Sequence, residues 1–459
     1  MRSGGGPLQD IPWDICVSGK YLYVTGIYDD HAVFGQDTLV SVKVRDVFLL
    51  KYDLEGNLVW AVSGGSTGED YGYCVAADDS DNVYIAGDIG WSATFGDIYV
   101  PRIGGASDIF LAKYDSTGTC RWAKSLGSST SYDHAADIKV VKDDLFLGGG
   151  FTGTILFDTA MFAAVEYNDI YVAHYKTDGK FVDVGVAGGG KNDILTFLAV
   201  DERLNVFITG YFFDDLIIGN TILHAGTSPT NLLALYKPGK GFVRVKTYRD
   251  FQAWDLEYAG DNSFLLSGSF DDTLTLGQTH LGTMDGHQAF LAAFDSTGTF
   301  GWALETRSSS SFSNHGGEVA AGSSYFLTGV FSGEMTAGSQ VLTTAGSFGM
   351  FLARAGEGAA FVGQEELSRS VEISVTPNPA ADHVRISYHL PDRGHVKIDL
   401  YDAGGKYLRT LVDDFRPAGD HSASLGVTGL PPGVYFLRLS TDHAGESVKM
   451  MVVKQGDHR

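Results

Sequence analysis

The sequence predicts an all-β protein, and three observations support this fold class. The chain has 59 glycines, 22 tyrosines and 28 phenylalanines among its 459 residues, and only 19% of its residues are charged. Glycine permits tight turns, and aromatic and β-branched residues favour strands. Short apolar segments alternate with turns rich in Asp, Ser, Asn and Gly, and this arrangement recurs at a nearly constant period. A coiled coil, a helical bundle and a disordered chain are excluded.

Two sequence markers recur six times in step. The first is a glycine after an apolar stretch, and it occurs at Gly26, Gly87, Gly148, Gly210, Gly268 and Gly329, with spacings of 61, 61, 62, 58 and 61 residues. The second is the apolar centre of segments such as Asp-Val-Phe-Leu-Leu, and it occurs at Phe48, Phe110, Tyr171, Leu233, Phe290 and Phe351, with spacings of 62, 61, 62, 57 and 61 residues. Because the two markers move together, they define six copies of one unit.

Each unit reads as four short strands separated by turns, which is an antiparallel meander. Both faces of such a sheet are apolar, so radial stacking of the copies buries both faces, and closing the ring leaves only short edges. The sequence therefore predicts a six-bladed β-propeller over residues 8–360. The sixth copy ends weakly near residue 360, and Ser3-Gly-Gly-Gly resembles the end of a fourth strand. A seventh blade, formed by residues missing upstream, stays open as an alternative.

The repeat stops after a polar spacer, residues 361–370. Residues 371–459 then show the period-2 alternation of half-buried strands, as in Val396-Lys-Ile-Asp-Leu-Tyr401. About seven such strands predict a small Ig-like β-sandwich.

Several linked motifs of this last segment resemble a known export label. They include the residues Pro377, Asn378, Pro379, Gly433, Tyr435 and Lys454. The segment is similar to the type A C-terminal sorting domain of the type IX secretion system of the Bacteroidota. This resemblance implies that residues 371–459 engage the type IX secretion machinery, that the protein reaches the outer-membrane surface or the medium, and that the label is usually removed. An ordinary fibronectin-like spacer is the alternative.

The repeats resemble the bacterial SBBP repeat, a β-propeller unit of similar length. The match is best at residues 71–123, which include Asn82-Val-Tyr-Ile-Ala-Gly and Asp108-Ile-Phe-Leu-Ala-Lys-Tyr-Asp. Copies three, four and six depart from the pattern because they lack its Trp-Ala segment. The resemblance implies a propeller and assigns no chemistry, since one fold carries many functions.

Charge and hydropathy exclude two classes of partner. The chain has 33 basic and 56 acidic side chains, a formal net charge of −23, which repels nucleic acid. No apolar run approaches the length of a transmembrane helix, so no transmembrane segment is expected. The N-terminus lacks the apolar region of a signal peptide, so we expect that the export signal was removed or that the chain is truncated.

The three cysteines, Cys16, Cys74 and Cys120, fit no metal-binding spacing. Each lies in a strand-like apolar context, so we expect small buried hydrophobic residues. A Cys16–Cys74 disulfide is the alternative.

The candidate site lies on the first strand of each copy. Alignment of the copies places four acids at one position, and Gly72 and Phe197 occupy it in the other two copies; the acids are Asp14, Asp137, Asp255 and Glu318. First strands line the channel of a propeller, so the carboxylates would need solvent, raised pKa values or a cation such as Ca²⁺. Alternatively, they accept backbone N–H bonds between neighbouring blades. Whether a metal binds is left open, and no other cofactor is expected.

Aromatic residues give a second candidate feature. Trp13 and Trp254 each precede an acidic position and could form a ligand platform, whereas Trp60, Trp122 and Trp302 recur in register in the fourth strand and read as packing residues. Paired aspartates after the repeat glycine, such as Asp29-Asp30, read as turn residues, with a calcium or sugar site as the alternative.

No nucleophile, zinc, phosphate-loop or EF-hand motif occurs in the sequence. The leading hypothesis is therefore a secreted or surface-attached, non-catalytic binding or adhesion module that recognises a glycan or protein ligand. The alternative is an extracellular hydrolase or lyase that acts on polysaccharide with the four acids, since two carboxylates suffice for glycoside cleavage.

Overall fold

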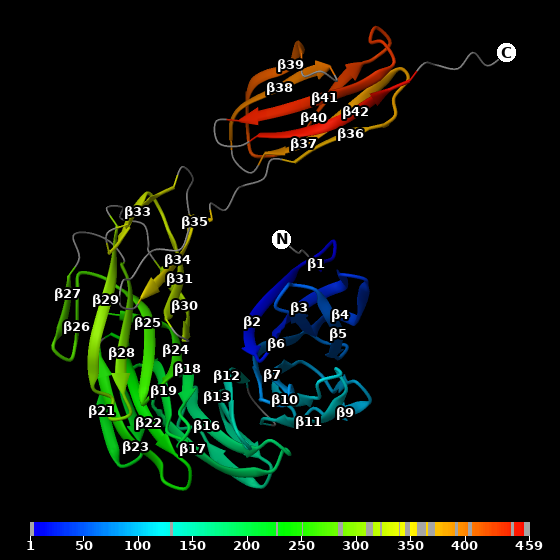
Figure 1. The fold of residues 1–459 in the computed structure, drawn as a ribbon. Helices are drawn as coiled ribbons and strands as arrows, with labels where there is room; N and C mark the ends of the chain where they lie inside the picture. Colours follow the sequence, from blue (N-terminus) through cyan, green and yellow to red (C-terminus); the bar gives the residue numbers. More distant parts are fainter. Residues whose placement is uncertain are drawn as a thin grey trace. The chain divides into compact units, whose positions relative to one another are not determined.

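The computed structural model describes residues 4–128, 132–225, 228–249, 251–282, 288–308, 315–321, 324–338, 340–344, 349–355, 364–365, 372–390, 393–402, 406–441 and 445–453. All the regular elements in these ranges are β-strands (Figure 1), so the all-β prediction is confirmed. Two compact units divide the chain. The larger unit contains the strands up to β31, and the smaller unit contains β36 to β42. The segment from β32 to β35 is divided between the two units.

Six four-stranded antiparallel meanders correspond to the six sequence repeats. In chain order the strands are β2 (Asp10–Ser18), β3 (Tyr21–Phe34), β4 (Asp37–Asp53) and β5 (Leu58–Gly65) in repeat 1; β6 (Asp70–Ala77), β7 (Val83–Ile89), β10 (Asp108–Tyr114) and β11 (Cys120–Leu126) in repeat 2; β12 (Asp133–Val141), β13 (Asp144–Phe151), β16 (Asp169–Lys176) and β17 (Phe181–Gly189) in repeat 3; β18 (Asp193–Val200), β19 (Val206–Phe212), β22 (Thr230–Lys237) and β23 (Gly241–Tyr248) in repeat 4; β24 (Phe251–Gly260), β25 (Ser263–Phe270), β28 (Gln288–Asp295) and β29 (Phe300–Ser308) in repeat 5; and β30 (His315–Ala321), β31 (Tyr325–Phe331), β34 (Gly349–Ala355) and β35 (Gln364–Glu365) in repeat 6.

A short hairpin joins the second and third strands of repeats 2 to 6. The hairpins are β8 (Ala93–Phe95) with β9 (Ile98–Val100), β14 (Thr154–Phe157) with β15 (Ala160–Ala163), β20 (Asp215–Ile218) with β21 (Thr221–His224), β26 (Thr273–Leu276) with β27 (Thr279–Gly282), and β32 (Glu334–Ala337) with β33 (Gln340–Thr343). Strands β8, β20 and β32 pair with the fourth strand of the preceding repeat. The two-residue strand β1 (Gly4–Gly5) pairs with the tip of β3 in the same way. Each pairing covers an outer edge that would otherwise be open.

The first strands of successive repeats pack side by side in the order β2, β6, β12, β18, β24 and β30. In the described residues no comparable packing joins β30 to β2, so the predicted six-bladed closed ring is not confirmed. The exposure of the first strands agrees with this observation. The Ile15 side chain of β2 is 51% exposed, whereas the residues at the equivalent position are buried, namely Val75, Ile138, Leu198 and Leu256. Among the described residues, no preceding repeat covers this position in repeat 1 as one does in repeats 2 to 5.

A recurring latch joins the outer parts of neighbouring repeats. The indole Nε1 of Trp60 donates to the Ser116 carbonyl at 3.1 Å, and that of Trp122 donates to the Thr177 carbonyl at 3.2 Å. Each acceptor lies in the turn of the next repeat, and the glycine of that turn, such as Gly179 at φ +86°, lies against the indole. The prediction that these tryptophans are packing residues is confirmed for both.

One repeat glycine was aligned wrongly by a single residue. Gly149, not Gly148, stands opposite its first strand as Gly26 and Gly87 do. Three consecutive glycines hide this register in the sequence. The residue four positions later then has positive φ in five repeats, at Asp30, Gly153, Asp214, Asp272 and Gly333. The pairs Asp214-Asp215 and Asp271-Asp272 lie at the bend before the hairpin, as predicted for turn residues, whereas Asp29-Asp30 lies at a bulge inside β3, where the prediction of a turn is wrong.

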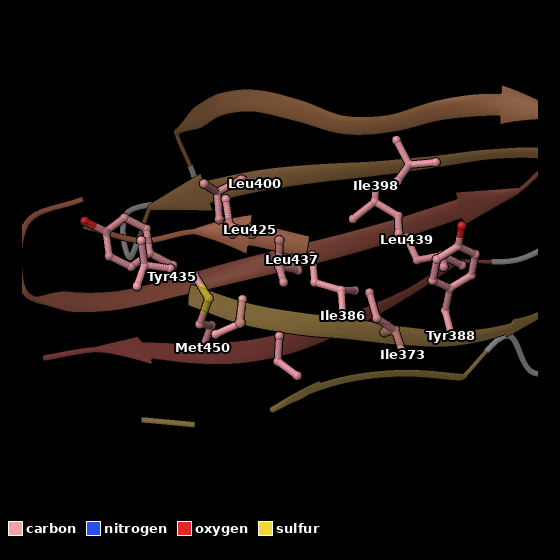
Figure 2. Packing of buried hydrophobic residues seen from close by; sticks show 14 of the residues in the cluster. Ile373, Ile386, Tyr388, Ile398, Leu400, Leu425, Tyr435, Leu437, Leu439 and Met450 are labelled. Carbon is pink, nitrogen blue, oxygen red and sulfur yellow. The ribbon is translucent and has the colours of Figure 1, made fainter. Parts of the chain in front are cut away.

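The smaller unit is a sandwich of seven strands, as predicted. One sheet has the order β36 (Glu372–Thr376), β37 (His383–Leu390), β40 (Gly419–Gly426), and the other has the order β39 (Tyr407–Arg416), β38 (Gly394–Asp402), β41 (Gly433–Thr441), β42 (Gly445–Val452). Alternate residues of both sheets, among them Ile386, Ile398 and Leu437, point into one apolar core (Figure 2). The boundaries 8–360, 361–370 and 371–459 stay predictions.

We expect Trp122→Ala to lower the free energy of unfolding of the repeat unit by about 2–4 kcal/mol, because it removes the indole packing and the bond to the Thr177 carbonyl. Urea unfolding followed by circular dichroism measures this loss. Trp91→Ala is the matched control, since Trp91 is exposed and contacts the Arg102 guanidinium, and we expect it to cost less than about 1 kcal/mol. Equal losses in the two variants would contradict the latch.

Candidate functional site

One cavity of about 860 Å³ is lined by residues from the first strands of all six repeats, β2, β6, β12, β18, β24 and β30. Three of the predicted acids, Asp14, Asp137 and Asp255, line it. The backbone of Glu318 lies in β30, but its side chain lies outside the described residues. The cavity is therefore the candidate functional site.

A β-bulge positions the acids. In the first strands of repeats 1 to 5 the pairing register shifts just before the acidic position, as between Pro12 and Asp14 or between Ala253 and Asp255, and in β30 the shift spans Glu318. A bulge turns the following side chain and frees backbone groups from the ladder. In repeat 2 the shift falls between Gly72 and Cys74, so Cys74, and not Gly72, is the equivalent of Asp14. The predicted alignment missed this because a bulge has no fixed sequence signature.

Each of the three aspartates bridges two neighbouring repeats through backbone amides. The Asp14 carboxylate accepts the Ile15 N–H at 2.7 Å and the Val75 N–H of the next repeat at 2.7 Å. Asp137 and Asp255 repeat this geometry, and their donors from the next repeat are Leu198 at 2.9 Å and Val319 at 2.8 Å. The alternative of inter-repeat N–H bonds is therefore confirmed for these three acids.

A lysine that the sequence reasoning missed supplies the positive charge. Lys139 of β12 lies on the cavity wall, and its Nζ is 3.5 Å from Asp137 Oδ1 and 3.5 Å from Glu257 Oε2 of β24. Lys139 follows Asp137 by two residues, so the period-2 rule places both side chains on one face of the strand. The sequence therefore contained a signal that pairs Lys139 with Asp137. It contained no signal that Lys139 also contacts Glu257 of repeat 5.

Burial and this ammonium group set the titration of the acids. Burial raises the pKa of Asp14 to about 6, although the charge of Lys139 opposes the rise, and the negative charge of Asp137 adds to it. Burial also raises the pKa of Asp137. Burial alone would lower the pKa of Lys139, but the charges of Asp137 and Glu257 outweigh it and hold that pKa well above its ordinary value.

Aromatic residues from three repeats gather beside the acids. The Trp13 ring is edge-on to Tyr73 with centroids 5.7 Å apart, and Tyr73 is edge-on to His134 at 6.3 Å. Trp13 and Tyr132, which also lines the cavity, are 48% and 50% exposed. Sequence reasoning named Trp13 but missed the other three. Trp254 is not among the described lining residues, and its indole Nε1 donates to Ser269 Oγ at 2.9 Å.

Two cysteines also line the cavity, and neither is in a disulfide. Cys16, Cys74 and Cys120 are all free thiols, so the alternative of a Cys16–Cys74 bridge is wrong. Burial raises the pKa of both cavity thiols, which keeps them protonated and inert. Within the described ranges, no group of three or more His, Cys, Asp or Glu side chains is placed to hold a metal ion. Calcium in the channel stays a prediction.

The sorting-type motif has a structural basis in the smaller unit. The Asn378 side chain donates to the Lys449 carbonyl and accepts the Met451 N–H, both at 2.8 Å, so it pairs with the edge strand β42. Pro377 and Pro379 flank it and hold this segment out of the ladder, because proline has no N–H. Tyr435 is buried in the core, and its hydroxyl donates to the Pro431 carbonyl. Gly433 begins β41, and Lys454 lies outside the described residues.

The described residues contain no helix that could cross a membrane. Among solved structures, the chain is similar to YCF48 bound to D1 peptide, with 9% identity, a TM-score of 0.28, and coverage of 72% of this chain and 92% of that chain. It is also similar to dimeric latent PorU from Porphyromonas gingivalis, with 9% identity, a TM-score of 0.18, and coverage of 84% of this chain and 33% of that chain.

Among curated proteins, the WD repeat-containing protein L264 of Acanthamoeba polyphaga mimivirus is 26% identical over 244 residues. The alignment covers 48% of this chain but only 16% of the length of that relative. The family model of the secretion system C-terminal sorting domain matches residues 374–454, which run from within β36 to just past the end of β42. The C-terminal segment of this chain is therefore a C-terminal sorting domain, and it implies export through the type IX secretion system to the cell surface or the medium.

Proposed function

We propose that this chain is an extracellular binding protein of a Bacteroidota bacterium, built from six SBBP-type blades that close into a propeller, and that it recognises a glycan at the aromatic side of the central cavity. The observation that carries the proposal is the edge-on cluster of Trp13, Tyr73 and His134 beside a cavity of about 860 Å³. The sorting domain, residues 371–459, delivers the protein through the type IX machinery.

The chemistry of the cavity suits a sugar. Exposed aromatic faces such as that of Trp13 stack on the apolar face of a sugar ring, and a few placed polar groups select its hydroxyls. The Tyr132 hydroxyl and the His134 imidazole supply polar groups next to the aromatic faces. The strands that carry these side chains are held together, because the aspartates that line the cavity accept backbone amides of two repeats.

The same contacts favour binding over catalysis. Each oxygen of Asp14 and of Asp137 accepts a backbone N–H, and the Lys139 Nζ lies 3.5 Å from both Asp137 Oδ1 and Glu257 Oε2, so these side chains are engaged in structural contacts. The second candidate is a polysaccharide hydrolase or lyase, and the observation that favours it is Asp14, whose pKa of about 6 suits a general acid. Turnover on a polysaccharide panel that is lost in the quadruple alanine variant of Asp14, Asp137, Asp255 and Glu318 would favour the enzyme. Binding of a polysaccharide without turnover would favour the non-catalytic binding protein.

We expect Trp13→Ala to weaken glycan binding at least about tenfold, because it removes an aromatic face from the cavity mouth. A glycan array identifies the ligand, and isothermal titration calorimetry with that glycan measures the loss. The matched control is Trp91→Ala, an exposed tryptophan that does not line the cavity, and its affinity should equal that of the wild type. Equal affinity in Trp13→Ala, or an equal loss in both variants, would contradict the site.

Deletion of residues 371–459 should trap the repeat unit in the periplasm. The sorting domain is the part that the type IX machinery recognises, and the repeat unit has its own buried cores. Cell fractionation and immunoblotting measure the distribution. Resistance of the trapped protein to limited proteolysis shows that it has folded, and undiminished export would refute the role of the label.

Stability should depend on Lys139 in a pH-dependent way. The folded-state pKa of Asp14, about 6, lies above its ordinary 3.8, so its contribution to stability grows as the pH falls through 6 and is lost at higher pH. We expect Lys139→Met to lower the free energy of unfolding by about 2 kcal/mol at pH 8, where it leaves buried carboxylates unbalanced, and by less at pH 5. Urea unfolding at both pH values measures this, with the exposed Lys191→Met as control. A loss that is the same at both pH values would contradict this account.

A further inference from the structure

Two buried aspartates lie together where repeats 3 and 4 meet, outside the lining of the central cavity. Asp169 begins β16 and Asp193 begins β18, and they are 2% and 0% exposed. Burial raises the pKa of Asp169 to about 6. Burial, and then the negative charge of Asp169, raise the pKa of Asp193 to about 8. The two aspartates are also neighbours in space, because the Asp193 N–H donates to the carbonyl of Asn168, the residue before Asp169, at 2.7 Å, and the Asn168 side chain donates to the Asp193 carbonyl at 2.6 Å.

Most oxygens of this pair have no hydrogen-bond partner. Asp169 Oδ2 accepts the Val165 N–H at 3.1 Å. Asp169 Oδ1 and both oxygens of Asp193 are buried, and none has a partner among the described residues. The Gly189 N–H lowers the pKa of both carboxyls and the Phe213 N–H lowers the pKa of Asp193, but neither N–H is in hydrogen-bond geometry with the three unpaired oxygens. Unpaired buried carboxylate oxygens are costly, so a positive group is expected to face them.

A glycine makes the room beside them. A Cβ at Gly188 would lie 1.9 Å from Asp169 Cγ, so a side chain at this position would overlap the carboxyl. The same plan recurs at the two earlier junctions, where Gly65 lies against Asp46 and Gly127 lies against Asp108. The recurrence shows that the repeat uses a glycine here to accommodate the carboxyl.

The earlier junctions differ from this one in their partners. All oxygens of Asp70, which faces Asp46, are hydrogen-bonded to Ser66 and Gly90. At the second junction the Arg102 charge acts on Asp108. Unpaired buried oxygens also occur at the earlier junctions, at Asp46 Oδ1 in the first and at Asp108 Oδ1 and Asp133 Oδ1 in the second, but the junction of repeats 3 and 4 has three. No lysine or arginine is among the described charges that act on Asp169 or Asp193.

The junction of repeats 4 and 5 has no acid at either of the two equivalent positions. Thr230 and Phe251 replace the two aspartates, and Arg249 replaces the glycine. The Arg249 guanidinium donates to the Ala225 carbonyl at 2.8 Å. The fold thus holds a positive group here and points a carbonyl at it. By the repeat alignment, the equivalent carbonyl between repeats 3 and 4 belongs to Ala164.

We propose that Asp169 and Asp193 form a calcium-binding site between repeats 3 and 4, with a backbone carbonyl as a further ligand. Calcium takes six to eight oxygen ligands in flexible geometry, and paired carboxylates with carbonyl oxygens and water are such a set. A bound ion would replace the repulsion of the two carboxylates by attraction to a common charge and join the two repeats. The site is independent of the glycan proposal, because none of its residues lines the central cavity.

The test uses the full chain, stripped with EDTA and dialysed at pH 8. We expect added CaCl₂ to raise the melting temperature by about 5 °C at a concentration 100-fold above Kd. Isothermal titration calorimetry should show at least one calcium equivalent more in the wild type than in Asp193→Asn. Without calcium, Asp193→Asn should melt higher than the wild type, because it removes one of two repelling charges. Asp178→Asn, at an exposed turn, is the matched control and should behave as the wild type.

Metal analysis of the wild type after dialysis against CaCl₂ needs no variant, so it decides the proposal even if Asp193→Asn fails to fold. No bound calcium would overturn it. So would equal calcium stoichiometry in the wild type and in folded Asp193→Asn. A melting temperature that ignores calcium and rises as the pH falls from 8 to 6 would show that the pair shares a proton instead of a metal ion.

Discussion

The bond from an aspartate carboxylate to the backbone N–H of the next repeat is the interaction on which the cavity depends. Each first strand carries a bulge, and the bulge leaves an amide outside the ladder at the place where neighbouring repeats meet. A carboxylate at that place accepts the free amide of its own strand and that of its neighbour, as Asp137 does with Ile138 and Leu198. Three such bridges join repeats 1 with 2, 3 with 4, and 5 with 6, so the cavity wall is built in pairs.

The bridges place negative charge inside the protein, and the chain compensates it in several ways. Backbone amides carry part of the charge, and the ammonium group of Lys139 carries more across the cavity to Glu257. Protonation is a third means, because burial raises the pKa of Asp14 to about 6. The buried aspartates at the junctions between repeats have fewer hydrogen-bond partners, and Asp193, whose two side-chain oxygens are both unpaired among the described residues, is the extreme case. We therefore expect the stability of the fold to respond to pH, and under the calcium proposal also to cations.

Much of the architecture was predictable, because it depends on local and periodic features. Six copies, four strands per copy and the packing role of Trp60 and Trp122 follow from residue types that recur at fixed spacing. The Asp14 position was found in the same way. Its true equivalent in repeat 2, Cys74, was not, because the bulge inserts a residue without changing the composition of the strand. Lys139 and Tyr73 were missed because their importance comes from side chains of other repeats.

By itself the sequence determined the all-β class, the six repeats and the C-terminal sorting domain, because short-range periodicity and linked motifs are written into consecutive residues. Only the tertiary structure decided which groups meet around the cavity, that the acids are bound to amides of the next repeat, that the cysteines are free thiols, and that the first strands of successive repeats pack side by side. These properties depend on contacts between residues about sixty positions apart, such as Asp14 with Val75, and no local pattern encodes the register of such contacts.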